Sequence, residues 1–408
     1  MTATVSARHG VDSAYAWRLA LVCMLCIGLG GGAIYMPVVA LKEIAAEFGG
    51  SRAVPSTAYM LGFFCMGLGG VLMGWLADRT SPRVPLIIAG VSIMVGGWLA
   101  ASGGEWALYA GYALPLGFLG NAGTFTPAMN NIQGWFERRR SLAVSIISVG
   151  PALSGSVWPQ VYRWLLPAWG WRHTLVVCCM VAGALLFACA FYVRPAPVIR
   201  AASGSRRAED LTGLPISSPL LMTILSAAGF CCCAAMAVPF VHMVAFCGDL
   251  GLPPGRGSEA IALILLTALA ATFASGRLSD HFGALRVSLM LSSIQLVSLT
   301  GYTLVTSLWG VYALSIVHGI PYIAIVQGYA LILRRLYGSS IAGWRLGVVM
   351  LFAMAGMAAG GWLGGIIFDA TLSYRPAFQA ALGFDFLNFM LLGLLFAARR
   401  RTMVGARV

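Results

Sequence analysis

Long apolar stretches separated by short polar segments dominate this chain. A stretch of about 20 apolar residues is long enough to cross the hydrocarbon core of a bilayer as a helix. Small residues are frequent inside the stretches, as close packing of helices in lipid favours, and they are densest over 357–365. We therefore expect an all-α membrane protein. The predicted transmembrane helices are twelve: 17–41, 54–77, 84–102, 106–131, 141–165, 172–193, 219–246, 259–277, 284–305, 309–333, 344–368 and 376–398.

Composition and charge agree with this interpretation. The chain has 408 residues, of which 59% are hydrophobic and 10% are charged, too apolar for a soluble fold of this length. A net charge of +13 suggests nucleic acid until the basic residues are placed along the chain. Most of them fall on one side of the predicted spans, and loops rich in Lys and Arg stay in the cytoplasm. The charge therefore reflects topology, with both termini cytoplasmic, and we expect no nucleic-acid partner.

The longest polar stretch, residues 194–218, contains Arg200, Arg206, Arg207 and several prolines. Its composition predicts a flexible cytoplasmic linker between two halves. We expect an N-terminal six-helix bundle over 1–193 and a C-terminal six-helix bundle over 219–408, which ends in a short basic cytoplasmic tail.

The ten cysteines lie in or beside the predicted spans. Consecutive residues of a helix point in different directions, so Cys231, Cys232 and Cys233 make a poor metal site. We interpret the cysteines as small packing residues, and we expect no disulfide framework, metal or cofactor. Residues 1–16 lack the pattern of a cleaved signal peptide, so we expect the first span to direct the chain to the membrane.

One loop sequence occurs twice. Residues 74–79 read Gly-Trp-Leu-Ala-Asp-Arg with Arg83 four positions on, and residues 276–281 read Gly-Arg-Leu-Ser-Asp-His. An anion just after a helix end is disfavoured by the helix dipole, so Asp78 needs a nearby cation or the start of another helix. The duplication predicts two related halves and a conformational latch. The predicted latch residues are Gly74, Asp78, Arg79, Arg83, Gly276, Asp280 and Arg286.

The first copy resembles the signature between helices 2 and 3 of the major facilitator superfamily, and the second resembles its weaker echo between helices 8 and 9. Other segments resemble the monocarboxylate-transporter and oxalate–formate-antiporter branch: a polar fourth span, the loop 135–140, Gly-Trp-Arg at 170–172 and Asp-x-Thr-x-Ser-Tyr-Arg-Pro-Ala-Phe at 369–378. The resemblance implies two pseudo-symmetric six-helix bundles. It also implies a secondary carrier of small organic anions that works by alternating access, and we expect it to act as a monomer.

Polar side chains inside the spans are costly and mark candidate sites. Asn121 has an amide that can donate two hydrogen bonds to a carboxylate. An imidazole can titrate near neutral pH and donate to a carboxylate, which makes His242 and His318 candidates, although an intramembrane histidine is equally a structural hydrogen-bonding group. The further substrate-binding candidates are Tyr35, Gln160, Tyr322 and Gln327.

Asp385 is the carboxylate that we place near mid-membrane, in the last span. A buried carboxyl group can carry a coupling proton, so Asp385 is our proton-coupling candidate. The alternative is structural, because the twelfth helix of this fold lies at the periphery and Asp385 can bond to a neighbouring helix.

The sequence differs from the branch at the positions where a cationic residue would meet a substrate anion. Carriers of this branch often place a cationic residue in span 1 or an Arg in span 8, whereas here Val38 follows Pro37 and residues 267–273 carry no charge. Moving an unpaired carboxylate into a low-dielectric cavity costs several kcal/mol of free energy. Three options follow: His and amide donors meet the anion, it crosses with a proton as the neutral acid, or the substrate is not an anion.

Two other functions compete with carriage of an organic acid. Residues 150–155 partly resemble the Gly-Pro signature of proton-driven exporters of drugs or neutral and cationic metabolites, although the fourth span lacks their intramembrane Arg. A membrane-embedded enzyme is disfavoured because no zinc-type His pair, Gly-x-Ser-x-Gly or carboxylate pair lies within a span. We expect a multi-pass carrier of the cytoplasmic membrane that moves a small organic acid, coupled to protons.

Overall fold

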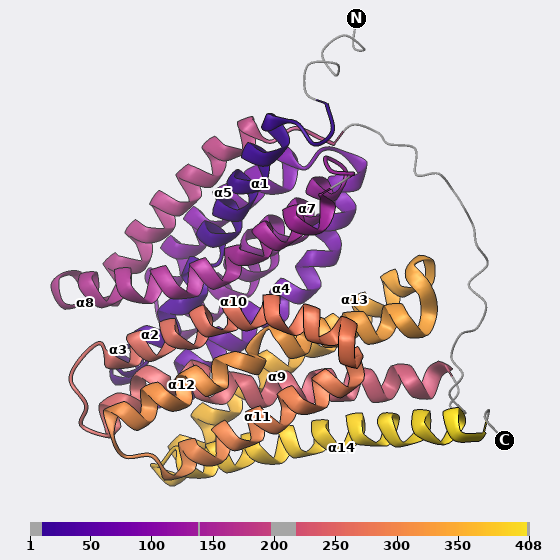
Figure 1. Cartoon of the computed structure of the whole chain (residues 1–408). Helices are drawn as coiled ribbons and strands as arrows, with labels where there is room; N and C mark the ends of the chain where they lie inside the picture. Colours follow the sequence, from indigo (N-terminus) through magenta and orange to yellow (C-terminus); the bar gives the residue numbers. More distant parts are fainter. Residues whose placement is uncertain (1–9, 138, 197–217, 406–408) are drawn as a thin grey trace, which may run out of the picture. The chain divides into compact units, whose positions relative to one another are not determined.

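The computed structural model describes residues 10–137, 139–196 and 218–405, and these residues form helices joined by short turns (Figure 1). The chain divides into two compact units. The first comprises residues 1–50 and 57–203, and the second comprises residues 51–56 and 204–408. Each unit is described by itself.

The first unit contains the helical segments that precede residue 193. In chain order they are α1 (Ala14–Gly30), η2 (Gly32–Tyr35), α2 (Met36–Val39), α3 (Leu41–Glu47), α4 (Ala53–Arg79), α5 (Arg83–Ala101), α6 (Glu105–Gly111), the π-helix η3 (Tyr112–Asn121), α7 (Ala122–Gln133) and α8 (Arg140–Tyr192). The opening residues of α4, up to Ser56, group with the second unit.

The second unit continues with α9 (Ser218–Asp249), α10 (Arg256–Phe282), α11 (Ala284–Leu304), α12 (Leu308–Tyr322), α13 (Ala324–Thr371) and α14 (Arg375–Gly405). Within this unit α9 packs against α13 and α14, and α11 lies beside α14 (Figure 1).

The prediction of an all-α membrane protein is confirmed. Ten helical stretches in the described part of the chain are long and apolar enough to cross a membrane. One of them, over 142–192, has 51 residues, enough for two crossings of about 20 residues each. It contains Gly170, whose φ of 66° and ψ of 170° interrupt the helix between the predicted spans 141–165 and 172–193. The predicted span 106–131 is divided among α6, η3 and α7, so no single helix covers it.

The first span departs from a regular α-helix where its glycines cluster. A Cβ on Gly30 would lie 2.5 Å from a methyl carbon of Thr124, and a Cβ on Gly32 would overlap the indole of Trp158. The backbone tightens to the 3₁₀-helix η2 at this point, and carbonyls freed inside a membrane protein need other donors. Aromatic side chains supply them at 2.9 Å: Trp158 Nε1 to Gly28 O, Tyr162 OH to Gly32 O, and Tyr112 OH to Ala33 O.

Close packing of α9 on α13 explains part of the small-residue stretch at 357–365. A Cβ on Gly360 would overlap the carbonyl group of Ala234 on α9. One turn earlier, a Cβ on Gly356 would overlap the carbonyl group of Phe230. Only a residue without a side chain lets the two backbones approach this closely, as small residues do between helices in lipid.

Candidate functional site

A carboxylate from one helix caps the start of another within the second unit. Asp369, near the end of α13, accepts hydrogen bonds from Ser51 Oγ at 2.6 Å and from the backbone nitrogens of Arg52 at 2.8 Å and Ala53 at 2.9 Å. The first amides of an α-helix have no intrahelical acceptor, and a negative charge at a helix N-terminus is favourable. Asp369 therefore supplies to α4 both the missing acceptors and the favoured charge.

The Arg52 side chain connects this cap to an ion pair. Its guanidinium donates to both carboxylate oxygens of Asp249, at 2.6 and 2.9 Å, and donates to the hydroxyl of Tyr374 at 2.8 Å. It also lies 3.5 Å from the ring centroid of Phe368. Burial alone would lower the pKa of Arg52, but the bonds to Asp249 and Tyr374 outweigh burial and raise that pKa. We call Ser51, Arg52, Ala53, Asp249, Asp369 and Tyr374 the α4 clamp.

His242 of α9 extends the clamp into the interior of the second unit. Its imidazole is fully buried, with Nε2 2.9 Å from the carbonyl oxygen of Gly361 and Nδ1 3.3 Å from the hydroxyl of Tyr374. A carbonyl oxygen only accepts, so Nε2 carries the hydrogen and Nδ1 accepts from Tyr374. Burial raises the pKa of the Tyr374 phenol, which keeps its proton available for this bond. Hydrogen bonds thus run from Asp249 through Arg52 and Tyr374 to His242; we call these four residues the His242 chain.

His318 of α12 lies in a separate, neutral environment. It is fully buried, and its Nδ1 is 2.9 Å from Ser298 Oγ. The Ser298 hydroxyl also lies within hydrogen-bond distance of the carbonyl of Gln295, at 2.8 Å. The ring centroid of His318 lies 6.1 Å from that of Tyr322. The structure therefore brings these two predicted residues together.

Asp385 of α14 sits in a second buried network. Its Oδ1 accepts from Ser292 Oγ at 3.2 Å and from Asn388 Nδ2 at 3.1 Å, while Oδ2 has no hydrogen-bond partner among the described residues. Asn388 in turn donates to Ser292 Oγ and accepts from Tyr329 OH at 2.7 Å. We call Asp385, Ser292, Asn388 and Tyr329 the Asp385 cluster. It joins α14 to α11 and α13, and a proton on its free oxygen is the simplest partner for the group.

The other predicted binding residues fall in different environments. Asn121 ends the π-helix η3 and is 9% exposed, and its side-chain amide makes no hydrogen bond within the described part of the chain. Tyr35 is buried in η2, and Gln160 is half-buried in α8. Gln327 is half-buried in the first turn of α13. Non-α stretches recur at functional sites, and Asn121 and Tyr35 lie in such stretches.

The first predicted latch loop has a close helix contact at its glycine. A Cβ on Gly74 would lie 3.1 Å from a methyl carbon of Thr126 on α7. Asp78 is exposed, Arg79 lies 4.5 Å from the ring of Trp75, and the Nε of Arg83 donates to the carbonyl of Val193 at 2.5 Å. The structure therefore directs both arginines to partners other than Asp78.

The second predicted latch loop is more open. No atom lies within 4 Å of a Cβ built on Gly276, and the guanidinium of Arg286 lies 5.7 Å from the ring of Phe396. The side chain of Asp280 lies outside the described residues. The structure thus gives Gly276 no close helix contact of the kind that Gly74 makes.

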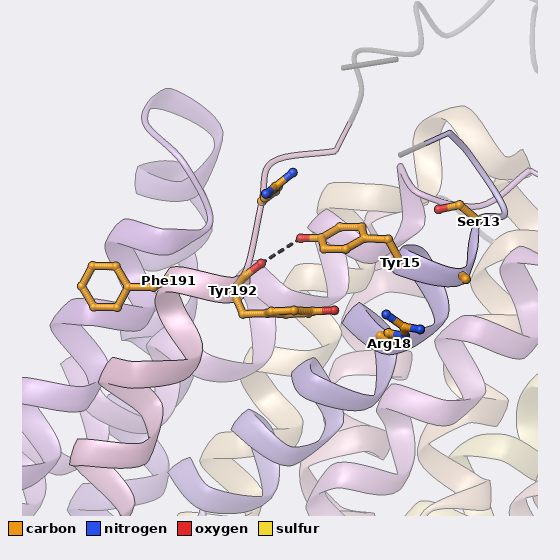
Figure 2. A pocket seen from close by; sticks show the side chains of 7 residues that line it. Ser13, Tyr15, Arg18, Phe191 and Tyr192 are labelled. Atoms are coloured by element: carbon orange, nitrogen blue, oxygen red, sulfur yellow. Dashed lines mark hydrogen bonds between the residues drawn. The ribbon is translucent and has the colours of Figure 1, made fainter. Parts of the chain in front are cut away.

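A hollow of about 460 Å³ lies in the first unit, between the start of α1 and the end of α8. Figure 2 shows the hydroxyl of Tyr15 directed at the backbone carbonyl of Tyr192, which accepts its hydrogen bond at 2.8 Å. Arg18 and Arg194 also line the hollow, so it is basic and aromatic. The predicted substrate-binding residues lie elsewhere in the chain.

Sequence reasoning did not assign a functional role to the α4 clamp. The sequence 369–378 suggested only family membership, whereas its Asp369 and Tyr374 both contact Arg52 or its backbone. A usable signal was present in the sequence. A cation beside a helix start and an anion at a helix end are both disfavoured by the helix dipole, so each needs an opposite charge nearby.

Comparison with known proteins identifies the family of this chain. Residues 20–273, more than half of the chain, match the model of the Major Facilitator Superfamily. The chain is 25% identical to monocarboxylate transporter 13 of Bos taurus, over 91% of this chain and 87% of that protein. It is 25% identical to human monocarboxylate transporter 11, over 90% and 80%. It is also 25% identical to the agnestins efflux protein AgnL12 of Paecilomyces divaricatus, over 72% and 67%.

A solved structure shows the same fold. The bacterial homologue of the human lysosomal transporter Spinster, inward-facing and unoccupied, matches with a TM-score of 0.74, 15% identity, and coverage of 96% of this chain and 98% of that one. The helical architecture and the match of the family model agree on one assignment. The chain belongs to the Major Facilitator Superfamily and is a multi-pass membrane transporter.

Proposed function

We propose that this transporter carries a small organic acid together with protons, by alternating access. The observation that carries the proposal is the 25% identity to monocarboxylate transporters 13 and 11, which extends over 91% and 90% of the chain. In the proposed cycle the bundles 1–193 and 219–408 alternate, joined by the linker 194–218. The partners are the acid, protons and the lipid bilayer, and the chain acts as a monomer.

The charges of the spans favour carriage of the acid with a proton. Placing an unpaired carboxylate in a low-dielectric cavity costs several kcal/mol of free energy. Spans 17–41 and 259–277 offer neither Lys nor Arg at the positions where related carriers often place them. A protonated acid needs only neutral hydrogen-bonding groups, which the side-chain amide of Asn121 can supply. The proposed binding residues are Tyr35, Asn121 and Gln160 in the first unit, and His242, His318, Tyr322 and Gln327 in the second.

Asp385 is the proposed carrier of the coupling proton among the carboxylates. Its unpartnered Oδ2 lies in a network with no cation in contact among the described residues, and a buried charge without a partner is costly. A proton relieves that cost, which supports a role in proton exchange.

The loops around Gly74 and Gly276 are the proposed latch of the cycle. Close contact of Gly74 with α7 supports a helix interface there. Exposed Asp78 is free to pair with different cations at different stages, which is what a reversible latch requires. Asp280 and Arg286 are the proposed counterparts in the other half.

The basic residues support one orientation in the membrane. Arg79, Arg83, Arg139 and Arg286 all lie at the ends of predicted spans on the side of the linker, where the positive-inside rule places the cytoplasm. We propose the cytoplasmic membrane, with both termini in the cytoplasm and the segment 369–375 on the outer side.

Uptake into proteoliposomes tests the proposed function. Radiolabelled monocarboxylates and dicarboxylates are each offered with and without an inward proton gradient. We expect uptake of at least one acid, stimulated by the gradient. Folded, inserted protein that takes up none of the acids contradicts the proposal.

A second candidate is proton-driven export of a drug or a neutral or cationic metabolite. The similarity to a fungal efflux protein, over 72% of this chain, favours it. Efflux of such compounds against a proton gradient, with no uptake of the acids, supports export instead of acid uptake.

A further inference from the structure

The His242 chain and the α4 clamp share Arg52, Asp249 and Tyr374, so a change at the buried imidazole is felt at the start of α4. We propose that His242 is a proton-binding site whose protonation releases the α4 clamp. The inference rests on the proposed proton coupling and names the group through which a proton acts on the protein.

The hydrogen bonds of the His242 chain match donors with acceptors only while His242 is neutral. The Gly361 carbonyl takes the hydrogen of Nε2, and the Tyr374 hydroxyl gives its single hydrogen to Nδ1. The same hydroxyl oxygen accepts from Arg52. Every polar atom of His242 and Tyr374 is thereby satisfied, and Nδ1 is the one atom of the imidazole that can take a proton.

A proton taken from water forms an N–H bond at Nδ1 and reverses the direction of the bond to Tyr374. The hydroxyl must then accept from His242, and its own hydrogen loses its acceptor. An unsatisfied buried donor costs about 1–3 kcal/mol. The new imidazolium also faces the guanidinium of Arg52 across a single hydroxyl. Like charges at such distances repel strongly where water is excluded.

The charged groups that face His242 decide the direction of the effect. They are Arg52 from the start of α4 and Asp369 from α13. Asp249 lies on the same helix as His242, and Tyr374 is the titratable group in contact with it. Asp249 and Asp369 are already occupied by Arg52 and by the amides of α4, so neither is free to neutralise the imidazolium. The available response is departure of Arg52, with Ser51 and Ala53 beside it.

Two neighbouring glycines of α13 fit this coupling. A Cβ on Gly364 would lie 2.5 Å from the imidazole of His242. A Cβ on Gly365 would overlap Ser56 Oγ and lie 2.8 Å from the carbonyl oxygen of Arg52. Two adjacent positions of α13 therefore contact the histidine and the start of α4, without side chains between these groups and the α13 backbone.

Hydrogen–deuterium exchange of the purified full-length protein in detergent tests the proposal without any substrate. The readout is protection of the amides of Arg52 and Ala53, which donate to Asp369, corrected for the intrinsic pH dependence of exchange. In the proposed released state His242 contacts water, where an imidazole titrates at about pH 6.5. Protonation of that state therefore raises the released population about tenfold between pH 7.5 and pH 5.5. Solvent-exposed carboxylates titrate at about pH 4, below this window.

Three variants identify the titrating group. His242→Gln keeps a donor for Gly361 and an acceptor for Tyr374 but does not titrate, so we expect the tenfold loss of protection to disappear. Tyr374→Phe removes the link and is expected to abolish the step as well. The matched control His173→Gln, at an exposed histidine of the first unit, is expected to keep it.

Specific outcomes overturn the proposal. It fails if the wild type shows no step in this window, if the step persists in His242→Gln, or if His173→Gln removes it. If His242→Gln does not purify as a monodisperse protein, persistence of the step in Tyr374→Phe overturns it equally. The panel of radiolabelled acids is a separate arm, so failure to find a transported acid leaves the exchange result independent.

Discussion

The His242 chain and the Asp385 cluster are two buried polar networks of the same unit with different boundaries. The His242 chain ends in an ion pair whose side chains are 12% exposed at Arg52 and 30% exposed at Asp249. The partners of Asp385 are the neutral side chains of Ser292 and Asn388. A proton arriving at His242 changes the fit of a charged contact at a helix start, whereas a proton arriving at Asp385 changes only neutral hydrogen bonds.

The difference shows that burial of a titratable group does not define its role. A fully buried histidine acts on a segment that is distant in sequence, because directional hydrogen bonds connect it to fixed charges. A buried carboxyl surrounded by hydroxyl and amide groups can exchange a proton with little change in its surroundings. The first arrangement suits the control of conformation, and the second suits the holding of a proton.

The largest expected effect is on transport, and it distinguishes the Asp385 cluster from the His242 chain. Asp385→Asn keeps an oxygen that can accept from Ser292 and Asn388, but it cannot bind and release a proton. We expect gradient-stimulated uptake of the identified acid to fall to the level seen without a gradient, while the pH step in exchange at Ala53 persists. Undiminished stimulation in correctly inserted protein means that Asp385 serves only to join α14 to its neighbours.

The next largest effect is a loss of stability caused by disturbed packing around His242. Gly364→Ala places a methyl group against the imidazole, and overpacking of this kind costs about 1–3 kcal/mol. We expect a lower thermal unfolding midpoint in detergent and loss of the pH step. The matched control is Gly383→Ala in α14, where a Cβ meets no atom within 4 Å. Equal midpoints for the two variants contradict the close seat of His242 on α13.

Removing the cap of α4 is expected to cost less. Asp369→Ala leaves the amides of Arg52 and Ala53 without acceptors, and loss of a helix cap costs about 0.5–2 kcal/mol. Asp369→Asn keeps one acceptor oxygen and is expected to lie between wild type and Asp369→Ala in unfolding midpoint. An Asp369→Ala protein as stable as wild type, with unchanged exchange at Ala53, argues that the clamp contributes nothing.

The smallest expected effect concerns the ion pair between Arg172 and Glu47, which is not connected to a buried histidine through hydrogen bonds among the described residues. Glu47 accepts from Arg172 in the first unit, and this bond, with help from Trp171, lowers the pKa of Glu47. A lowered pKa stabilises the fold at pH values above that of the unfolded chain, and the contribution is lost as pH falls through the folded-state value. Glu47 is 40% exposed in this pair, so solvent screens it.

We therefore expect Glu47→Gln to shift the unfolding midpoint only slightly at neutral pH and not at all in strong acid. Unfolding curves of the variant and the wild type at the two pH values measure this difference. A large shift at neutral pH contradicts the distinction between this exposed pair and the α4 clamp, where the side chain of Arg52 is only 12% exposed.

Several buried polar residues could be identified from the sequence because intramembrane polar residues are few. Asn121, His242, His318 and Asp385 stand out among apolar neighbours, and the structure buries each of them. Their partners could not be named in advance. Tyr329 meets Asn388 and Ser298 meets His318 only because particular helices pack together.

Local sequence determined the helical class, the apolar spans and the family, because the length and hydropathy of a span depend only on neighbouring residues. Tertiary structure alone decided which charges meet. Ser51 and Asp369 are 318 positions apart, and Arg52 and Asp249 are 197 apart. Hydropathy gives no information about such pairs, because they depend on the register and rotation at which helices pack. The small residues of α13 set that register by allowing the close approach of His242 and of the start of α4.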